Sequence, residues 1–429
     1  MSYETVKSFI LVVLIAISFL LSFILWSYQP NYDYLYSADY VNEVDIGGDE
    51  RGKNELLKPN KIILREGEEA TGFYDMVEQQ QLFQSIKSWE LSDYKIKEVE
   101  GRPNNKNYVE LIFPPKTPVE LVSTIFTFRE TPELPNWTFS RMFLRMNEES
   151  NTLKLGILSD DQTKMMEATI DKTDAYDIIQ SSFSNEEALA SFVTLEEGDH
   201  VIYVKSGPVQ LKEKTFVASK IKPDLFINAL FTNPNLVTQN MKEAYFTDGQ
   251  RGMRIVQDGR LLQFINPLQE KFEHSSALEL LEKSVNNINE HKGWTNNYYI
   301  ESIRPDVSNI RYRLHYAGYP VYNYGNLTII EQSWREQDLH EYNRPLVRIG
   351  NLLNARDIEL ISGEELIAYL QTDNEMELDK IEDIELGYML NFLEDDHSLT
   401  LEPQWSIYYE GQWTRFNVAE YERQRGGDL

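Results

Sequence analysis

The 429-residue chain contains no cysteine. Without thiols it forms no disulfide, offers no cysteine nucleophile and cannot bind zinc through thiolates. The absence also excludes a lipid-modified cysteine as a membrane anchor. A long chain that avoids thiol chemistry suits an oxidising or unbuffered compartment, which indicates a location outside the cytoplasm.

Motifs for catalysis are also absent. The sequence has no Walker motif, no GxGxxG, no GxSxG and no HExxH. Its six histidines never lie four residues apart, and the run Asp395-Asp396-His397 indicates solvated charge rather than a metal site. Asp45 to Gly52 resembles a calcium loop but lacks the alternating ligands and the closing glutamate. We therefore expect no catalytic residues, no cofactor, no bound metal and no enzymatic activity.

Basic residues are few, with 41 lysines and arginines against 69 acidic residues, which gives a formal net charge of −28. This balance opposes binding to a phosphate backbone and excludes a nucleic-acid partner. Because 41% of the residues are hydrophobic, the chain can still bury sizeable cores. The simplest interpretation of the acidic excess is a soluble, folded surface.

One long hydrophobic run stands out, from Phe9 to Trp26, with no charge in it. At about 1.5 Å per residue it spans roughly 27 Å, close to the hydrocarbon thickness of a bilayer. We expect a transmembrane helix over 8–27 after a cytoplasmic stub over 1–7. A cleaved signal peptide is the alternative, but Glu4 and Lys7 cancel before the run and no small-x-small cleavage site follows it.

The outer flank of the run sets the expected orientation. Between Pro30 and Glu50 there is no lysine or arginine, while acidic residues are frequent. The positive-inside rule then places the N-terminus in the cytoplasm and the bulk of the chain outside the cell membrane.

Turn signals divide the rest of the chain. We expect a juxtamembrane tether over 28–58 and then three α+β domains, over 59–148, 152–268 and 270–429. Together they predict an elongated ectodomain of antiparallel sheets with packed helices, in which the last two domains have related topology.

Several elements are predicted individually. We expect helices over 72–88, 175–183, 225–231, 275–291 and 363–370. The strongest strand signals are KIILRE at 61–66, YVELIF at 108–113, STIFTF at 123–128, a hairpin over 152–170, and hairpins at Asp248-Gly249, Asp258-Gly259 and Glu410-Gly411.

The anchor itself carries a candidate partner-binding seam. Ser18 and Ser22 lie four residues apart, so they share one helix face with Leu11, Ile15 and Trp26. Small side chains at this spacing let a second transmembrane helix approach closely. The alternative, that both serines bond to their own backbone, stays open.

At several positions the chain resembles one family. Five stretches are similar to the YycH (WalH) family of Gram-positive bacteria. They are LWSYQPNYD (25–33), which directly continues the anchor, YFTDGQRGMRI (245–255), LLQFINP (261–267), GYPVY (318–322) and LEPQWSIYYEGQW (401–413). The resemblance covers essentially the whole chain, and its specificity comes from the set of motifs and their order.

The resemblance implies a function that the residues alone do not supply. YycH-like proteins are non-enzymatic regulators that associate with a YycI-like protein and with the sensor histidine kinase WalK, also called YycG, partly through transmembrane helices. They tune kinase activity and hence cell-wall metabolism, and the sign of the regulation differs among members. The family provides no active-site residues and no cofactor.

Two other function classes remain open. One is an extracytoplasmic ligand-binding sensor subunit, whose pocket would be lined by the aromatic residues Tyr316, Tyr319, Tyr322, Tyr324 and Trp334. The other is a wall-processing hydrolase that uses paired carboxylates. Converging polar groups in a pocket would favour the first, and two facing carboxyls with a raised pKa would favour the second.

Overall fold

The computed structural model of the protein describes Ser18 and, from Val44 on, residues 44–87, 89–103, 107–147, 149–197, 200–240, 244–267, 275–372, 376–393, 397–416 and 421. Residues 44–429 form one compact unit, separate from residues 1–43. None of the described helices has the length and apolar character needed to span a bilayer. The predicted helix over 8–27 lies outside the described residues apart from Ser18.

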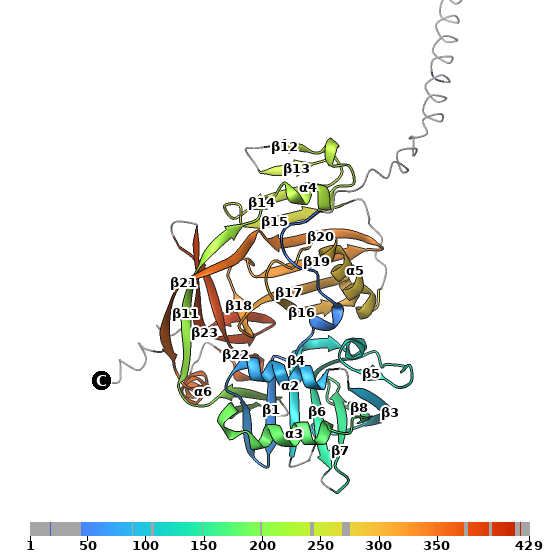
Figure 1. The fold of residues 1–429 in the computed structure, drawn as a ribbon, viewed down its shortest axis with the longest axis vertical. Helices are drawn as coiled ribbons and strands as arrows, with labels where there is room; N and C mark the ends of the chain where they lie inside the picture. Colours follow the sequence, from blue (N-terminus) through green and yellow to red (C-terminus); the bar gives the residue numbers. More distant parts are fainter. Residues whose placement is uncertain are drawn as a thin grey trace, which may run out of the picture. The chain divides into compact units, whose positions relative to one another are not determined.

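Two large sheets make up the described part of the chain from Val44 on (Figure 1). The first has ten strands in the order β10-β9-β2-β1-β4-β6-β7-β8-β3-β5. Its strands are β1 (Lys61–Glu66), β2 (Glu69–Phe73), β3 (Glu90–Glu98), β4 (Asn107–Pro118), β5 (Thr127–Phe128), β6 (Thr138–Asn147), β7 (Thr152–Leu158), β8 (Lys164–Ile170), β9 (Leu189–Glu197) and β10 (His200–Lys205).

The second sheet has fourteen strands and runs β12-β13-β14-β15-β20-β19-β17-β18-β22-β23-β11-β21, with β16 beside β17 and β24 beside β23. Its strands are β11 (Val209–Lys220), β12 (Thr238–Asn240), β13 (Tyr245–Thr247), β14 (Gly252–Val256), β15 (Leu261–Ile265), β16 (Tyr298–Arg304), β17 (Asn309–Tyr316), β18 (Tyr319–Tyr322), β19 (Ile329–Arg335), β20 (Asp338–Pro345), β21 (Val347–Leu360), β22 (Ile381–Phe392), β23 (Ser398–Tyr409) and β24 (Gln412–Arg415).

Nearly all of the strand pairs are antiparallel; β3–β5 and β18–β22 are the parallel ones among the described residues. The helices are α2 (Met76–Ile86), α3 (Ala175–Ser184), α4 (Leu225–Leu230), α5 (Ala277–Asn289) and α6 (Gly363–Thr372). In Figure 1, α2 and α3 cross the front of the first sheet and α5 lies against the second. The fold is thus mostly sheet with a few helices, which confirms the coarse form of the α+β prediction.

Local sequence signals set several of these elements. Ser276 caps α5 by accepting from the Glu279 amide, and the Glu279 carboxylate accepts from the Ser276 amide in return. The turn before β15 needs left-handed backbone, which Asp258 and Gly259 supply at φ of 55° and 83°. These elements are confirmed close to their predicted bounds.

Other elements differ from expectation. The segment STIFTF does not form one strand, because a 3-10 helix, η3 (Val119–Thr124), takes its first two residues and β5 its last two. Thr124, Ile125 and Phe126 are buried in succession, so the burial does not follow the alternation of a strand. The break expected after Asn147 is the turn between paired strands β6 and β7 of one sheet. The division into three separately folding domains stays a prediction, as do the elongated arrangement and the related topology.

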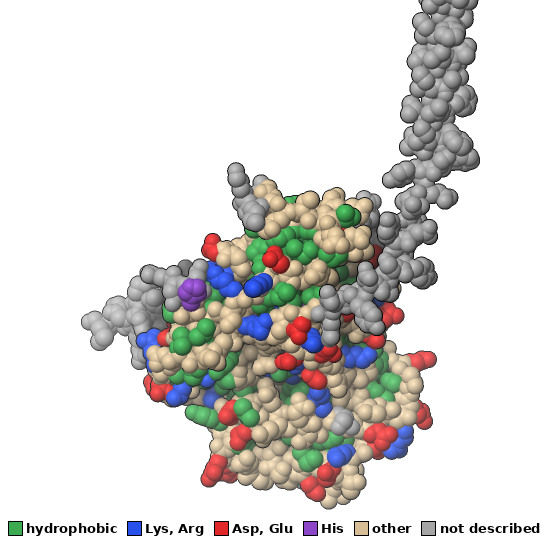
Figure 2. Space-filling model, turned by 45° about the horizontal axis from the view of Figure 1, so that its top comes forward, with side chains coloured by type: hydrophobic (Ala, Val, Ile, Leu, Met, Phe, Trp, Pro, Cys, Tyr) green, Lys and Arg blue, Asp and Glu red, His purple; other side chains and the backbone are tan. Residues whose placement is uncertain are grey.

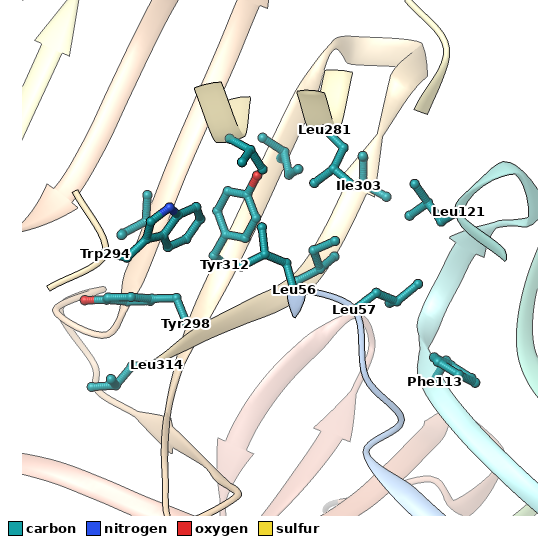
Figure 3. Close-up of a cluster of buried hydrophobic side chains, with 14 of the residues drawn as sticks. Leu56, Leu57, Phe113, Leu121, Leu281, Trp294, Tyr298, Ile303, Tyr312 and Leu314 are labelled. Carbon is teal, nitrogen blue, oxygen red and sulfur yellow. The ribbon is translucent and has the colours of Figure 1, made fainter. Parts of the chain in front are cut away.

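The segment Val44 to Lys58, expected as part of a tether, packs onto the second sheet. The amide of Ile46 donates to His291 O (3.1 Å), and Asp49 pairs with Trp294 in an isolated antiparallel bridge. Leu56 and Leu57 then enter a core shared by the two sheets. Figure 3 shows Leu57 on the side of Phe113 of β4 and Leu121 of η3, while Leu56 lies toward Tyr312 of β17 and Leu281 of α5. Both leucines are at most 1% exposed, so this segment joins the sheets.

Candidate functional site

A cavity of about 60 Å³ lies where the two sheets meet. The first sheet and the segment before it contribute Lys58, Asn60, Lys61, Phe73, Met76, Gln79, Phe192, Tyr203 and Lys205, and the second contributes His315, Gly318, Tyr319, Pro320, Ile384, Glu385, Leu386 and Trp405. The cavity has room for a few water molecules and is well below the roughly 300 Å³ at which ligand pockets begin. Its lining includes the buried charged residues Lys58, Lys205 and Glu385.

An ion pair crosses the junction between the sheets. The Lys61 ammonium, at the start of β1, lies 2.5 Å from a carboxylate oxygen of Asp383 on β22 and donates to Ile384 O at 2.7 Å. The two side chains are only 13% and 12% exposed. In so dry a place each charge depends on the other, because removing one leaves the other desolvated and unpaired.

Glu385 lies two residues after Asp383 on β22, on the same face of the strand, and is buried. It accepts from Asn60 Nδ2 (2.7 Å) and from the Tyr322 hydroxyl (3.4 Å). Burial, and next the neighbouring Asp383, raises the pKa of Glu385 to about 8. Its side chain is therefore held as a neutral acid near pH 7, which lowers the cost of burying it.

Lys58 is the other titratable group of this junction. Its ammonium donates to Gly318 O (3.0 Å) and lies 4.2 Å from the centre of the Tyr299 ring. Burial lowers the pKa of Lys58 to about 7. Gly318, at φ +87°, is required here, because a Cβ would lie 2.5 Å from Met76 Cβ. We name Lys58, Asn60, Lys61, Asp383 and Glu385 the inter-sheet clasp.

The clasp joins the sheets rather than presenting reactive groups. Asp383 and Glu385 are two carboxyls, one with a raised pKa, as the hydrolase alternative requires. Their oxygens, however, accept from Lys61, Asn60 and Tyr322, and the cavity beside them has no room for a sugar ring. The arrangement thus fits a structural connection that responds to protonation.

A second, larger hollow of about 790 Å³ is polar. It lies beside the start of β21 and is lined by Asp49, Glu50, Arg51, Glu55, Phe216, Trp294, Thr295, Asn296, Asn297, Leu314, His315, Tyr316, Ile349 and Gly350. Three carboxylates face one guanidinium among these side chains, so the hollow, here called the acidic cleft, favours cationic groups.

The aromatic residues proposed for a sensor pocket are not gathered in one place. Tyr319 lines the cavity and Tyr316 the acidic cleft, while Tyr322 is buried at the clasp. Trp334 is a core residue, and Tyr324 is 82% exposed. Sheet packing therefore accounts for most of this aromatic pattern.

The described histidines also take separate positions. His291 Nε2 lies 3.1 Å from the Tyr342 hydroxyl, and burial lowers the pKa of His291 to about 3. His200 Nε2 lies 2.8 Å from Glu382 O. His397 is exposed and lies directly before β23 in the chain. No group of three His, Asp or Glu side chains suited to a metal occurs in the described part of the chain.

Of the predicted seam, only Ser18 is described, as an exposed helical residue, so the whole seam of Leu11, Ile15, Ser18, Ser22 and Trp26 stays a prediction. Sequence reasoning missed the clasp because its partners lie more than 320 residues apart. The available signal was the spacing of Asp383 and Glu385, which puts two carboxyls on one face of a strand that is largely buried.

Comparison with known proteins identifies the family. The model of the YycH protein N-terminal domain matches residues 4–188, and that of the YycH protein C-terminal domain matches residues 199–424. The chain is 22% identical over 438 residues to "Two-component system WalR/WalK regulatory protein YycH" of Bacillus subtilis, covering 96% of each chain. The crystal structure of YycH from Bacillus subtilis superposes with a TM-score of 0.73 at 20% identity, over 87% of this chain and all of that one. The chain therefore belongs to the YycH family.

Proposed function

We propose that this protein is a non-enzymatic regulator of a membrane sensor histidine kinase of the WalK (YycG) type. The observation that carries the proposal is the match along 96% of a curated regulatory protein of the WalR/WalK two-component system. Both family models also match in order along the chain, the N-terminal one over 4–188 and the C-terminal one over 199–424.

The regulator acts from the membrane and from outside the cell. The uncharged run over 9–26 and the acidic stretch after Pro30 support a single-pass anchor with a cytoplasmic N-terminus. The signal passes sideways, through the seam and through ectodomain contacts, in a complex with a YycI-like protein that tunes cell-wall metabolism.

The test of the seam uses the full chain in membranes. Replacing Ser18 and Ser22 together by leucine keeps the helix hydrophobic while blocking close approach, and weakens association by about 1 to 2 kcal/mol. Val13→Leu with Phe19→Leu, on other faces, is the matched control. Kinase co-purification should fall, and kinase autophosphorylation should change, only in the serine variant.

Two results would contradict the proposal at different levels. Unaltered association in the serine variant, at equal membrane level, removes the seam and moves the contact to the ectodomain. Failure of the wild-type chain to co-purify with any histidine kinase, or to change its output, removes the regulatory function itself.

Topology has its own test. Protease added to intact protoplasts should digest the chain beyond Tyr28, because the acidic flank keeps that part outside. Full protection of the ectodomain would show that the orientation is reversed.

A further inference from the structure

Strand β21 is a long, open sheet edge. Among the described strands it pairs only with β11, and it ends the fourteen-stranded order, at the left of Figure 1. It has 14 residues, whereas the edge strands β5 and β12 have two and three. β10, the other end of the first sheet, is fixed to the second sheet through His200, whose ring contacts Glu382 O. Short or covered edges are the usual protection against pairing, and β21 has neither.

At the start of this edge, the side chain of Asn296 already makes the hydrogen bonds that a neighbouring strand would make. The Asn296 amide donates to Val347 O (3.3 Å) and accepts from the Ile349 amide (3.1 Å). Alternate residues of an antiparallel strand direct their amides and carbonyls away from the partner. Along the regularly paired stretch from Asn354 to Leu360, this alternation leaves outward main-chain groups that can bond to an added strand.

Exposed side chains accompany this open backbone. Residues 351–357 are all exposed, and Leu352 and Leu353 are 52% and 57% exposed. Two register shifts against β11 lie beside these leucines, whereas the stretch from Asn354 to Leu360 pairs regularly. The regularly paired stretch offers main-chain hydrogen bonds to an added strand, and the exposed leucines beside it offer apolar contacts to its side chains.

Charge selects the kind of strand. The acidic cleft lies at the start of the edge, with Gly350 on its wall. Along the edge, Arg356 pairs with Glu213 at 2.8 Å and Asp357 pairs with Lys212 at 3.5 Å, so charges of both signs balance there. The acidic excess therefore lies at the cleft. A second copy of this chain brings its own net charge of −28 and is repelled. On the face in Figure 2, acidic and basic side chains are mixed, so the specificity comes from these local groups.

We propose that β21 receives an extended, basic segment of another protein, added as a strand along Asn354 to Leu360 with a cationic side chain reaching the acidic cleft. Main-chain hydrogen bonds give the affinity, Leu352 and Leu353 cover apolar side chains of the segment, and the carboxylates of the cleft select its charge. This inference goes beyond the proposed function, since it concerns a contact and not kinase output.

Photocrosslinking of the full chain in its native membrane tests the proposal. Benzoylphenylalanine replaces Leu353 on the edge or, as control, Val307, which is 41% exposed on the loop between β16 and β17. Asp357→Lys with Glu359→Lys reverses the edge charge, and Glu186→Lys with Glu187→Lys makes the same charge change elsewhere. Mass spectrometry identifies the attached peptide.

We expect a crosslink from position 353 to a lysine- or arginine-containing segment of another protein, and none from position 307. Reversal of the edge charge should reduce it by about tenfold, because like charges then face each other, while the control pair leaves it unchanged. A crosslink to a second copy or to residues 422–429 of the same chain overturns the proposed occupant. Equal labelling from positions 353 and 307, or no loss on charge reversal, overturns the surface or its charge selection.

Discussion

Replacing Lys61 by methionine tests whether the inter-sheet clasp stabilises the junction. The ammonium lies 2.5 Å from Asp383, and both side chains are about one-eighth exposed, at 13% and 12%. Removing one partner of a buried pair costs about 3 to 5 kcal/mol, and the remaining exposure favours the lower end. We expect Lys61→Met to reduce the free energy of unfolding by about 3 kcal/mol.

The assay is urea unfolding of a fragment over 44–429, followed by tryptophan fluorescence and by far-UV circular dichroism. Two probes are needed because the two sheets can separate before either unfolds. Lys53→Met is the matched control, since Lys53 and Glu282 form a 3.2 Å pair that is 48% and 59% exposed. Such surface pairs contribute about 0 to 1 kcal/mol.

A second variant separates charge from packing. Lys61→Met combined with Asp383→Leu removes both charges, so no unpaired carboxylate is left, and most of the lost stability should return. If Lys61→Met costs no more than Lys53→Met, or if the double variant is less stable than the single one, the ion pair does not hold the junction and the reasoning fails.

Three further predictions concern stability and the N-terminal segment. Because the pKa of Glu385 is raised to about 8, stability should fall as pH rises from about 4.5 to about 8, and Glu385→Gln should flatten this decline in urea midpoints measured across pH. Because the pKa of Lys58 is lowered to about 7, stability should rise from about pH 7 toward 10.5, and Lys58→Met should remove that rise; an unchanged profile in either variant contradicts the assignment. A fragment starting at Leu57 should unfold at lower urea than one starting at Val44, since it lacks the buried Ile46, and equal midpoints would show that the segment adds nothing.

The sequence predicts local elements well where one residue type decides the backbone. Asp-Gly turns need left-handed φ, and a serine followed by glutamate three residues later caps a helix, so the hairpins around β14 and the start of α5 could be predicted. Each signal is complete within a few residues.

Neighbours in the sheets could not be predicted in the same way. β11 was expected in a central domain, yet it lies between β23 and β21 of the C-terminal part. Alternation indicates which face of a strand is buried but carries no information on which strand lies beside it. The clasp was missed for the same reason, because Lys61 and Asp383 become partners only after both sheets have formed.

The segment from Val44 to Leu57 has a mechanical consequence. Tension on the chain ahead of Val44 is borne first by four main-chain hydrogen bonds, one from Ile46 to His291, one from Gly48 to Lys292 and a reciprocal pair between Asp49 and Trp294. Next in line are the two leucines buried between the sheets, Leu56 and Leu57. A pull is thus delivered to the junction between the two sheets, and the same residues set the load at which the sheets come apart.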